Sequence, residues 1–221
     1  MVRFIFLYLF ALTLHFKVLS QDVSKDTSQK HAFVIPNDSS VKSWSFSATL
    51  WGYVVPTDRN FLSFIGYADH GSLHLEGRFN YEDIHTASVF AGWRFEVGKK
   101  ITLAFTPIVG FVFGNVNGFV PGLEFEASWK ILEYYSETEY VLDFAGSENN
   151  YLYTWGELGA NPFGSFKAGI SYQRTLLYHT GVDIQKGVFA SYSFWKMNAG
   201  VYYYNPFSSD QFWIFNFGIE F

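Results

Sequence analysis

The sequence contains no cysteine and few charged residues. None of its 221 residues is Cys, and Asp, Glu, Lys and Arg together make up 16% of the chain. Without thiols, disulfide bonds and thiolate metal sites are excluded. The charged fraction is also well below the roughly 25% of an average soluble domain. What the chain has in excess is aromatic residues, which make up 22%.

Long apolar runs are also missing, except at the start of the chain. Beyond it, no stretch approaches the roughly 20 apolar residues that a helical membrane span needs. Many short segments instead alternate apolar and polar residues, which predicts β-strands. No segment has a sustained helical period, and no Gly-rich phosphate loop or metal-binding loop motif occurs. We therefore expect an all-β protein without a cofactor and without a metal site.

The first residues, MVRFIFLYLFALTLHFKVLSQ, have the layout of a secretory signal peptide. Arg3 precedes an apolar run from Phe4 to Leu14, and Ser20 supplies a small residue for cleavage. The run is too short for a comfortable membrane anchor. We assign residues 1–20 to a signal peptide, with an uncleaved anchor as the alternative.

The rest of the chain divides into a polar leader, residues 21–43, and an alternating region, residues 44–221. Cleavage of the signal removes Arg3 and Lys17 but no acid, so the mature chain is more acidic than the net charge of −5 of the whole sequence. Nucleic acid is not an expected partner, because its phosphates would meet a negative surface.

The alternating region predicts a barrel of twelve antiparallel strands. They are expected at 44–54, 60–68, 72–81, 86–97, 100–113, 119–130, 132–143, 151–160, 164–176, 184–195, 197–205 and 211–221. Short turns alternate with longer polar links, which is typical of an up-and-down barrel with both termini at the short-turn end. Strand 60–68 alternates poorly, so ten strands is the alternative.

Each strand has one apolar and one polar face. In a transmembrane β-barrel the apolar face points outward to lipid, whereas a lipocalin-like soluble barrel has it inside. The apolar face carries many large rings, among them Trp93 and Trp129, and a small interior would have to hold all of them. This favours the transmembrane barrel.

The last strand, FWIFNFGIEF, ends the chain on an aromatic residue. Its apolar face consists of Trp213, Phe215, Phe217, Ile219 and Phe221. This ending resembles the C-terminal signal of bacterial outer-membrane β-barrel proteins, which the outer-membrane insertion machinery recognises. The resemblance implies a Gram-negative outer membrane, contact with its lipid, and periplasmic termini. It does not identify a subfamily, although a small porin-like channel is one member of this architecture.

The inward faces are rich in acid. The candidate lumen and selectivity residues are Glu76, Arg78, Arg94, Glu96, Glu124, Glu126, Glu133, Glu137, Glu139 and Glu157, with Glu220, Lys130, Lys167 and Lys186 as further inward charges. In the hairpin 119–143, a tight turn would pair Glu126 with Glu137 and Glu124 with Glu139, and a register shift of two would only exchange partners. Opposed like charges destabilise a sheet. Arg78 and Arg94, water in a pore, or a bound cation are the three ways to relieve this repulsion.

Aromatic residues form a second inward group. Its members are Trp51, Tyr53, Tyr135, Tyr153, Trp155, Tyr202 and Tyr204. They would either stack on a sugar or nucleoside in transit or simply fill a small barrel.

We expect an outer-membrane β-barrel with a narrow acidic lumen that passes small solutes or cations. A closed structural or surface-interaction barrel is the alternative, and a lipid-modifying enzyme is the least favoured reading. Neither His74 nor His85 has the spacing of a nucleophile–base pair, so no catalytic residue is assigned and no enzyme is expected.

Overall fold

The computed structural model describes residues 43–56, 58–174 and 184–221. The predicted signal peptide and nearly all of the predicted leader lie outside these residues. In the part of the chain that is described, no helix is long and apolar enough to cross a membrane.

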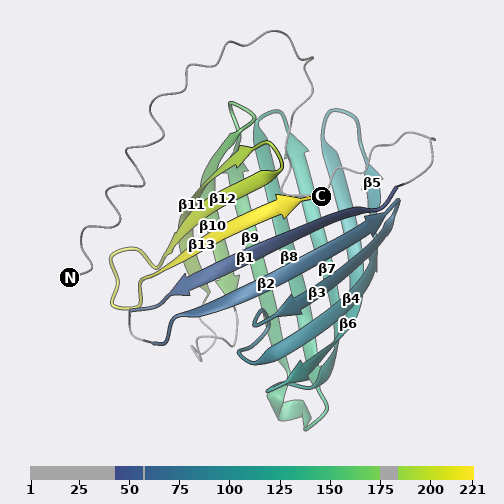
Figure 1. The fold of residues 1–221 in the computed structure, drawn as a ribbon, viewed down its shortest axis with the longest axis vertical. Helices are drawn as coiled ribbons and strands as arrows, with labels where there is room; N and C mark the ends of the chain where they lie inside the picture. The colour runs from purple at the N-terminus through teal and green to yellow at the C-terminus, as the bar shows by residue number, and fades with distance from the viewer. Residues whose placement is uncertain (1–42, 57, 175–183) are drawn as a thin grey trace.

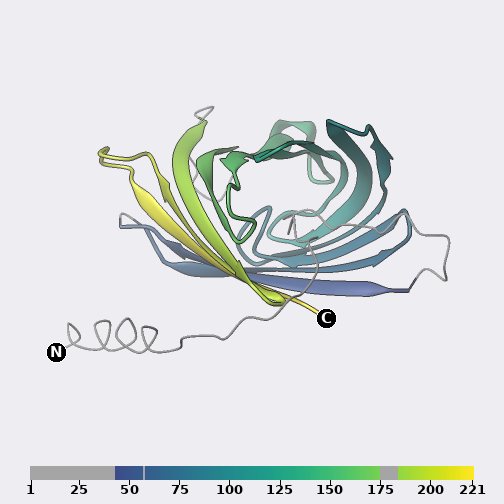
Figure 2. The ribbon, with the colours of Figure 1, turned by 90° about the horizontal axis from the view of Figure 1, so that it is seen from above.

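The described chain is a closed antiparallel β-barrel (Figures 1 and 2). Its strands are β1 Ser45–Val54, β2 Phe61–His70, β3 Leu73–Phe79, β4 Thr86–Trp93, β5 Phe95–Val97, β6 Thr102–Gly114, β7 Gly118–Trp129, β8 Leu132–Asp143, β9 Tyr151–Ala160, β10 Phe166–Arg174, β11 Gln185–Phe194, β12 Met197–Tyr204 and β13 Phe212–Glu220. Consecutive strands pair, and β1 pairs with β13 to close the wall, with Trp51 opposite Asn216.

β4 and β5 are two parts of one wall strand, separated only at Arg94, and both pair with β6. The wall therefore has twelve strands, which confirms the prediction. β2 is fully formed and pairs along its length with β1, so the ten-strand alternative is wrong.

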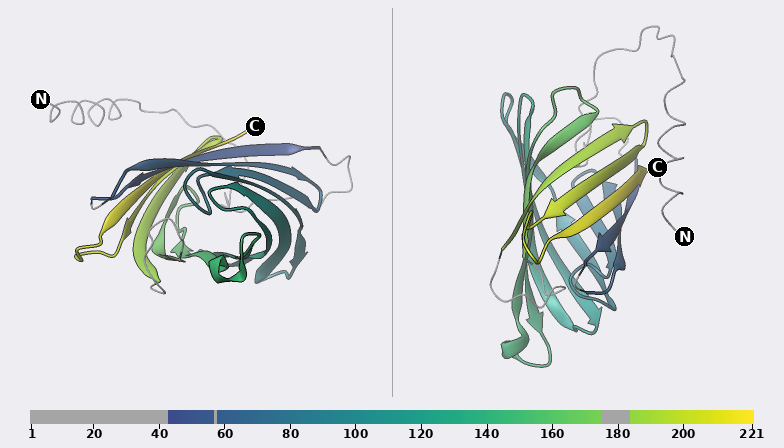
Figure 3. Two further views of the ribbon diagram at one scale, coloured as in Figure 1. Left: turned by 90° about the horizontal axis from the view of Figure 1, so that it is seen from below. Right: turned by 90° about the vertical axis from the view of Figure 1, so that its left-hand side faces the viewer.

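Short turns gather at one end of the barrel. They lie at 71–72, 98–101, 130–131, 161–165 and 195–196. The same end holds the start of β1 and the end of β13, where the Phe221 amide donates a hydrogen bond to the Phe46 carbonyl at 2.9 Å. Longer links, among them 80–85 and 144–150 with the short 3-10 helix Ser147–Asn149, lie at the other end (Figure 3). Outer-membrane β-barrels have short periplasmic turns, so we name the short-turn end the periplasmic end.

The outer surface is apolar and the inner side is polar. On β6, Phe105, Val109 and Phe111 are exposed to the outside, whereas Thr106 and Ile108 are buried inside. The same alternation runs through β13, where Trp213, Phe215 and Phe217 point outward and Asn216 points inward. Because large apolar side chains cover the outside, the lipocalin-like alternative does not apply and the outer face suits lipid.

The lipid-facing assignment predicts a depth-dependent effect of charge. Val109, in the middle of β6, and Val97, at the periplasmic end of β5, have similar exposed fractions of 52% and 55%. Val109→Arg should lower the free energy of unfolding by about 2–4 kcal/mol, because an outward Arg near the bilayer midplane is desolvated, whereas Val97→Arg should cost about 0–1 kcal/mol. Urea unfolding in phospholipid vesicles measures both. Equal losses would contradict this placement of the membrane.

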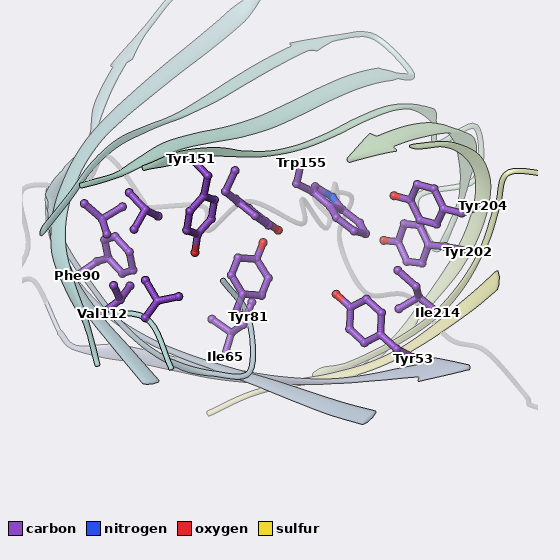
Figure 4. Packing of buried hydrophobic residues seen from close by; sticks show 14 of the residues in the cluster. Tyr53, Ile65, Tyr81, Phe90, Val112, Tyr151, Trp155, Tyr202, Tyr204 and Ile214 are labelled. Atoms are coloured by element: carbon purple, nitrogen blue, oxygen red, sulfur yellow. The ribbon is translucent and has the colours of Figure 1, made fainter. Parts of the chain in front are cut away.

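Away from the periplasmic end, the interior is filled by side chains (Figure 4). Buried residues of one cluster extend from Phe90 and Val112 past Tyr81 to Trp155 and Tyr204. The packing is close, because a Cβ added at Gly110 would lie 2.4 Å from a carbon of the buried Phe90 ring. The barrel is therefore not an open tube in this structure.

Candidate functional site

The centre of the interior is a single arginine surrounded by acids. The Arg78 side chain is 0% exposed and lies among Glu76, Glu82, Glu137 and Glu139. Its Nη2 lies 2.6 Å from Glu76 Oε2, and its Nη1 lies 2.8 Å from Glu137 Oε1 and 2.7 Å from Glu139 Oε1. Glu82 Oε1 is 3.3 Å from the same Nη1. One guanidinium thus holds together acids from β3, from β8 and from the link between β3 and β4.

That link, residues 80–85, folds into the barrel from the end opposite the termini. Tyr81 and Glu82 are both buried, and the Tyr81 ring lies against the Arg78 guanidinium, 4.7 Å from its centre. Ser88 donates a hydrogen bond to Glu82 Oε1 at 2.6 Å, and the Tyr151 hydroxyl donates one to the Glu82 carbonyl at 3.3 Å. Burial raises the pKa of the Glu82 carboxyl above its usual value. The link and Arg78 together close the lumen.

Two further basic side chains, Arg94 and Lys167, form ion pairs closer to the periplasmic end. Arg94 forms a bidentate salt bridge with Glu126, in which Nη2 of Arg94 lies 3.1 Å from Oε2 of Glu126. The same Nη2 lies 3.7 Å from Oε2 of Glu96. Lys167 lies 3.5 Å from Glu133 and 3.6 Å from Glu157. Arg94 therefore compensates acids on β5 and β7, and Lys167 compensates acids on β8 and β9.

His74 forms a compact group with three carboxylates. Its Nδ1 lies 2.6 Å from Asp69 Oδ1, and its Nε2 lies 3.0 Å from Glu76 Oε1 and 3.7 Å from Glu124 Oε2. Alternation along β3 places His74, Glu76 and Arg78 on one inner row, with Asp69 directly opposite His74 on β2. The hydroxyl of Tyr135 donates to the other oxygen of Glu124 at 3.0 Å.

The inward aromatic residues pack on one another beside these charges (Figure 4). The Trp155 ring is 5.4 Å from the rings of Trp51 and Tyr202, and Tyr202 is 6.4 Å from Tyr204. The hydroxyl of Tyr202 donates to Glu157 at 2.8 Å. Of the remaining predicted aromatics, Tyr53 and Tyr153 are buried and Tyr135 is half-buried inside the same space. The structure thus brings all seven together.

A cavity of about 160 Å³ occupies the periplasmic half of the lumen. Its lining extends from Lys196 and Glu220, at the periplasmic ends of their strands, to Tyr81 and Glu137 at the level of Arg78. Because Glu220 is exposed, the cavity reaches the periplasmic surface. It ends below the link 80–85.

Several sequence-based expectations about individual charges are wrong. β7 and β8 pair Glu124 with Glu137 and Glu126 with Tyr135, so the register expected from a turn at 131–132 is wrong and the alternative, shifted by two residues, is the one observed. The cause is the turn, which consists of Lys130 and Ile131 with Lys130 at a φ of 54°, so Lys130 does not face Glu133 inside.

Two other charges differ in exposure. Lys186 is exposed on the outer face, because Gln185, Gly187 and Phe189 take the inner positions of β11. Polar residues on both faces of this strand made its orientation ambiguous. Glu96 lies at the periplasmic mouth with 44% of its side chain exposed.

Sequence reasoning missed three members of the network. Asp69 was assigned to a turn, and Tyr81 and Glu82 were placed at or beyond the end of a strand, yet all three are buried. His74 was noted only as a weak catalytic candidate. Its position on the same inner row as Glu76 and Arg78 was the available signal.

Comparisons with known proteins identify the fold. No family model matches the chain, and no curated protein is significantly similar in sequence. Solved structures are similar in fold: the KdgM porin, alone and in complex with disordered oligogalacturonate, aligns with a TM-score of 0.54 and 16% identity over 79% of this chain and 98% of that chain. The Acinetobacter baumannii outer membrane protein Omp33 is a looser match, with a TM-score of 0.45 and 10% identity over 82% of this chain and 99% of that chain.

The closed twelve-stranded wall, the apolar outer surface and the likeness to the KdgM porin define the class of this protein. It is a closed antiparallel β-barrel with an apolar outer surface, of the transmembrane type, and it shares its fold with a porin. This confirms the fold class that the sequence predicted, and the bacterial outer-membrane location is a proposal that the fold supports.

Proposed function

We propose that the barrel passes small cations and small uncharged solutes, and that the described conformation is its closed state. The observation that carries this proposal is the acidic cavity on the periplasmic side. The acids on its lining are Asp69, Glu124, Glu126, Glu137, Glu157 and Glu220, and the basic groups are His74, Arg94 and Lys196. Acidic linings attract cations and repel anions.

The negative charge of the cavity argues against transport of oligogalacturonate, the solute in the complex of the KdgM porin. Oligogalacturonate, present in the KdgM complex, carries a carboxylate on each sugar. A cavity with excess negative charge opposes the entry of such a polyanion. We therefore propose that this barrel differs in solute class from that porin while sharing its fold.

The proposal predicts cation preference that depends on the cavity acids. In planar bilayers with a KCl gradient and a chelator, the reversal potential of the wild type should indicate cation selectivity. Glu124→Gln combined with Glu220→Gln keeps the side-chain sizes but removes two charges, so cation preference should fall severalfold. Glu148→Gln, which lies in the exposed 3-10 helix, should leave it unchanged. Anion selectivity of the wild type would contradict the proposal.

A closed structural or surface-interaction barrel is the second candidate, and one observation favours it. The Arg78 network and the buried cluster around Phe90, Val112 and Tyr151 fill the other half of the lumen. In that case folded protein should show no channel events at any applied voltage. The neighbours in fold are porins rather than enzymes, so a lipid-modifying activity has the least support.

The aromatic group beside the cavity is consistent both with a channel and with a closed structural barrel. Only part of the group, including Trp51 and Trp155, lines the cavity, and these rings also pack on one another. Blocking of the K⁺ current by a neutral sugar would support stacking on a solute in transit. Unchanged current would indicate that the rings only fill the barrel.

We also propose that β13 is the segment that the outer-membrane insertion machinery recognises. Phe215, Phe217 and Phe221 are exposed on the outer face, and the last strand closes the barrel against β1. Deleting Phe221, or replacing Phe217 and Phe221 with Ser, should reduce heat-modifiable barrel in the membrane fraction severalfold. Replacement of the exposed Phe207, which lies in a link, is the control. Equal losses in both would contradict the assignment.

A further inference from the structure

We propose that His74, Glu76 and Glu124 form a binding site for a divalent transition-metal ion, with Zn²⁺ as the probe that tests it. Imidazole and carboxylate groups are the ligands that such ions take in proteins. One nitrogen and two carboxylate oxygens of these residues lie within 4.8 Å of one another, and all three residues are buried.

The spacing of the ligand atoms matches a tetrahedral ion. Two atoms bound to one tetrahedral Zn²⁺ at about 2.0–2.1 Å lie about 3.3 Å apart. His74 Nε2 is 3.0 Å from Glu76 Oε1 and 3.7 Å from Glu124 Oε2, so the observed distances lie on either side of this value. The two carboxylate oxygens lie within 4.8 Å of each other, so all three atoms are close enough to reach one ion after side-chain rotation.

Each proposed ligand is held by a partner at its other polar atom. Asp69 binds Nδ1 of His74, which orients Nε2 toward the two carboxylates. Arg78 binds Oε2 of Glu76, and the Tyr135 hydroxyl donates to Oε1 of Glu124. Metal-binding histidines and carboxylates are characteristically oriented by such outer hydrogen bonds.

One oxygen in this group has no hydrogen-bonding partner. Glu124 is only 7% exposed, and no hydrogen bond to its Oε2 occurs among the described residues. The 3.7 Å separation from His74 Nε2 is too long for one. Oε2 thus belongs to a buried residue that lines the cavity, and it lies on the side of His74 Nε2, where a cation can reach it. Oδ2 of Asp69 is buried and has no hydrogen-bonding partner, so a second carboxylate of this group is incompletely compensated.

The surrounding charge balance favours a cation. The buried carboxylates around Arg78 and His74 are Asp69, Glu76, Glu82, Glu124, Glu137 and Glu139. Within the described residues, only these two basic side chains form ion pairs with them. A buried charge needs compensation. A divalent ion bound at His74 Nε2 takes the place of a proton on that nitrogen, so it adds one net positive charge at this point. His74 and Glu124 also line the cavity, so an ion reaches them from the periplasm and a fourth ligand position can face water.

This site does not require the barrel to conduct, so metal binding and transport are separate tests. Purified protein in detergent is stripped with a chelator, dialysed against Zn²⁺ and analysed for bound metal by mass spectrometry and calorimetry. We expect one tight Zn²⁺ per folded barrel, which Glu124→Gln and His74→Asn remove. Asp69→Asn should weaken binding about 10–100-fold, because it disturbs only the outer partner. Glu133→Gln, inside the same barrel but bonded to Lys167, is the matched control and should bind normally.

Co²⁺ substitution provides an independent readout, since its visible absorption reports a tetrahedral nitrogen–oxygen site. Heat modifiability shows whether each variant is folded, and Glu124→Gln removes a charge whose one ion pair among the described residues is the 3.7 Å contact with His74, so it should fold even if His74→Asn does not. No bound Zn²⁺ in the wild type would overturn the proposal. Full binding by folded Glu124→Gln protein would overturn it as well.

Discussion

Replacing Arg78 with Met should destabilise the barrel more than any other single substitution inside it. The change keeps much of the side-chain volume but leaves Glu76, Glu82, Glu137 and Glu139 around a centre without positive charge. Removing one partner of a buried ion pair costs about 3–5 kcal/mol. We expect a loss of that size in the free energy of unfolding, measured by urea titration followed by tryptophan fluorescence in lipid vesicles.

Two companion variants test the physical reason. Arg78→Lys should rescue only a small part of the loss, because one ammonium group lacks the planar fork that reaches several carboxylates at once. Adding Glu137→Gln and Glu139→Gln to Arg78→Met should recover stability, since these changes remove the unpaired charges. If Arg78→Met melts like the wild type, the network is not what holds this part of the barrel together.

Shortening two side chains of the inserted link, Tyr81 and Glu82, should open the lumen. Tyr81 lines the closed end of the cavity, donates a hydrogen bond to Glu137 at 3.2 Å and packs 5.1 Å from the Tyr153 ring. Replacing Tyr81 with Ala and Glu82 with Ser removes the ring and one of the acids bound by Arg78. Single-channel conductance should rise severalfold, because the cavity would then continue toward the extracellular end.

The control for this experiment lies in another link at the same end of the barrel. Asn149, in the short 3-10 helix, is exposed, so Asn149→Ala should not change the conductance. If both variants fold but show no channel events, the interior is permanently closed. That result would favour the structural alternative over the channel.

The sequence was sufficient for the architecture because a barrel wall repeats one local rule. Alternation with a period of two predicted which residues of β3 and β7 face inward, and turn residues predicted where strands end. The weak strand at 60–68 also formed, because hydrogen bonding to β1 and β3 on both sides outweighs its poor alternation. Arg94 interrupts its strand in a way that no local pattern indicated.

The ion pairs inside the barrel could not be predicted from single strands, because they depend on how the strands pair with one another. From the sequence, Arg78 and Arg94 were already the candidates for compensating the acids, because their positions face inward. The register of β7 and β8 was set by where Lys130 turned the chain, and the two-residue error moved every partner along that hairpin.

The sequence by itself therefore determined the fold class and, for most strands, which face points inward, since these depend on composition and strand periodicity. Only the tertiary structure decided that the link 80–85 enters the barrel, that Arg78 gathers four acids, and that His74 lies between Asp69, Glu76 and Glu124. These contacts join strands that are distant in the chain, and their geometry depends on the closure and curvature of the whole wall.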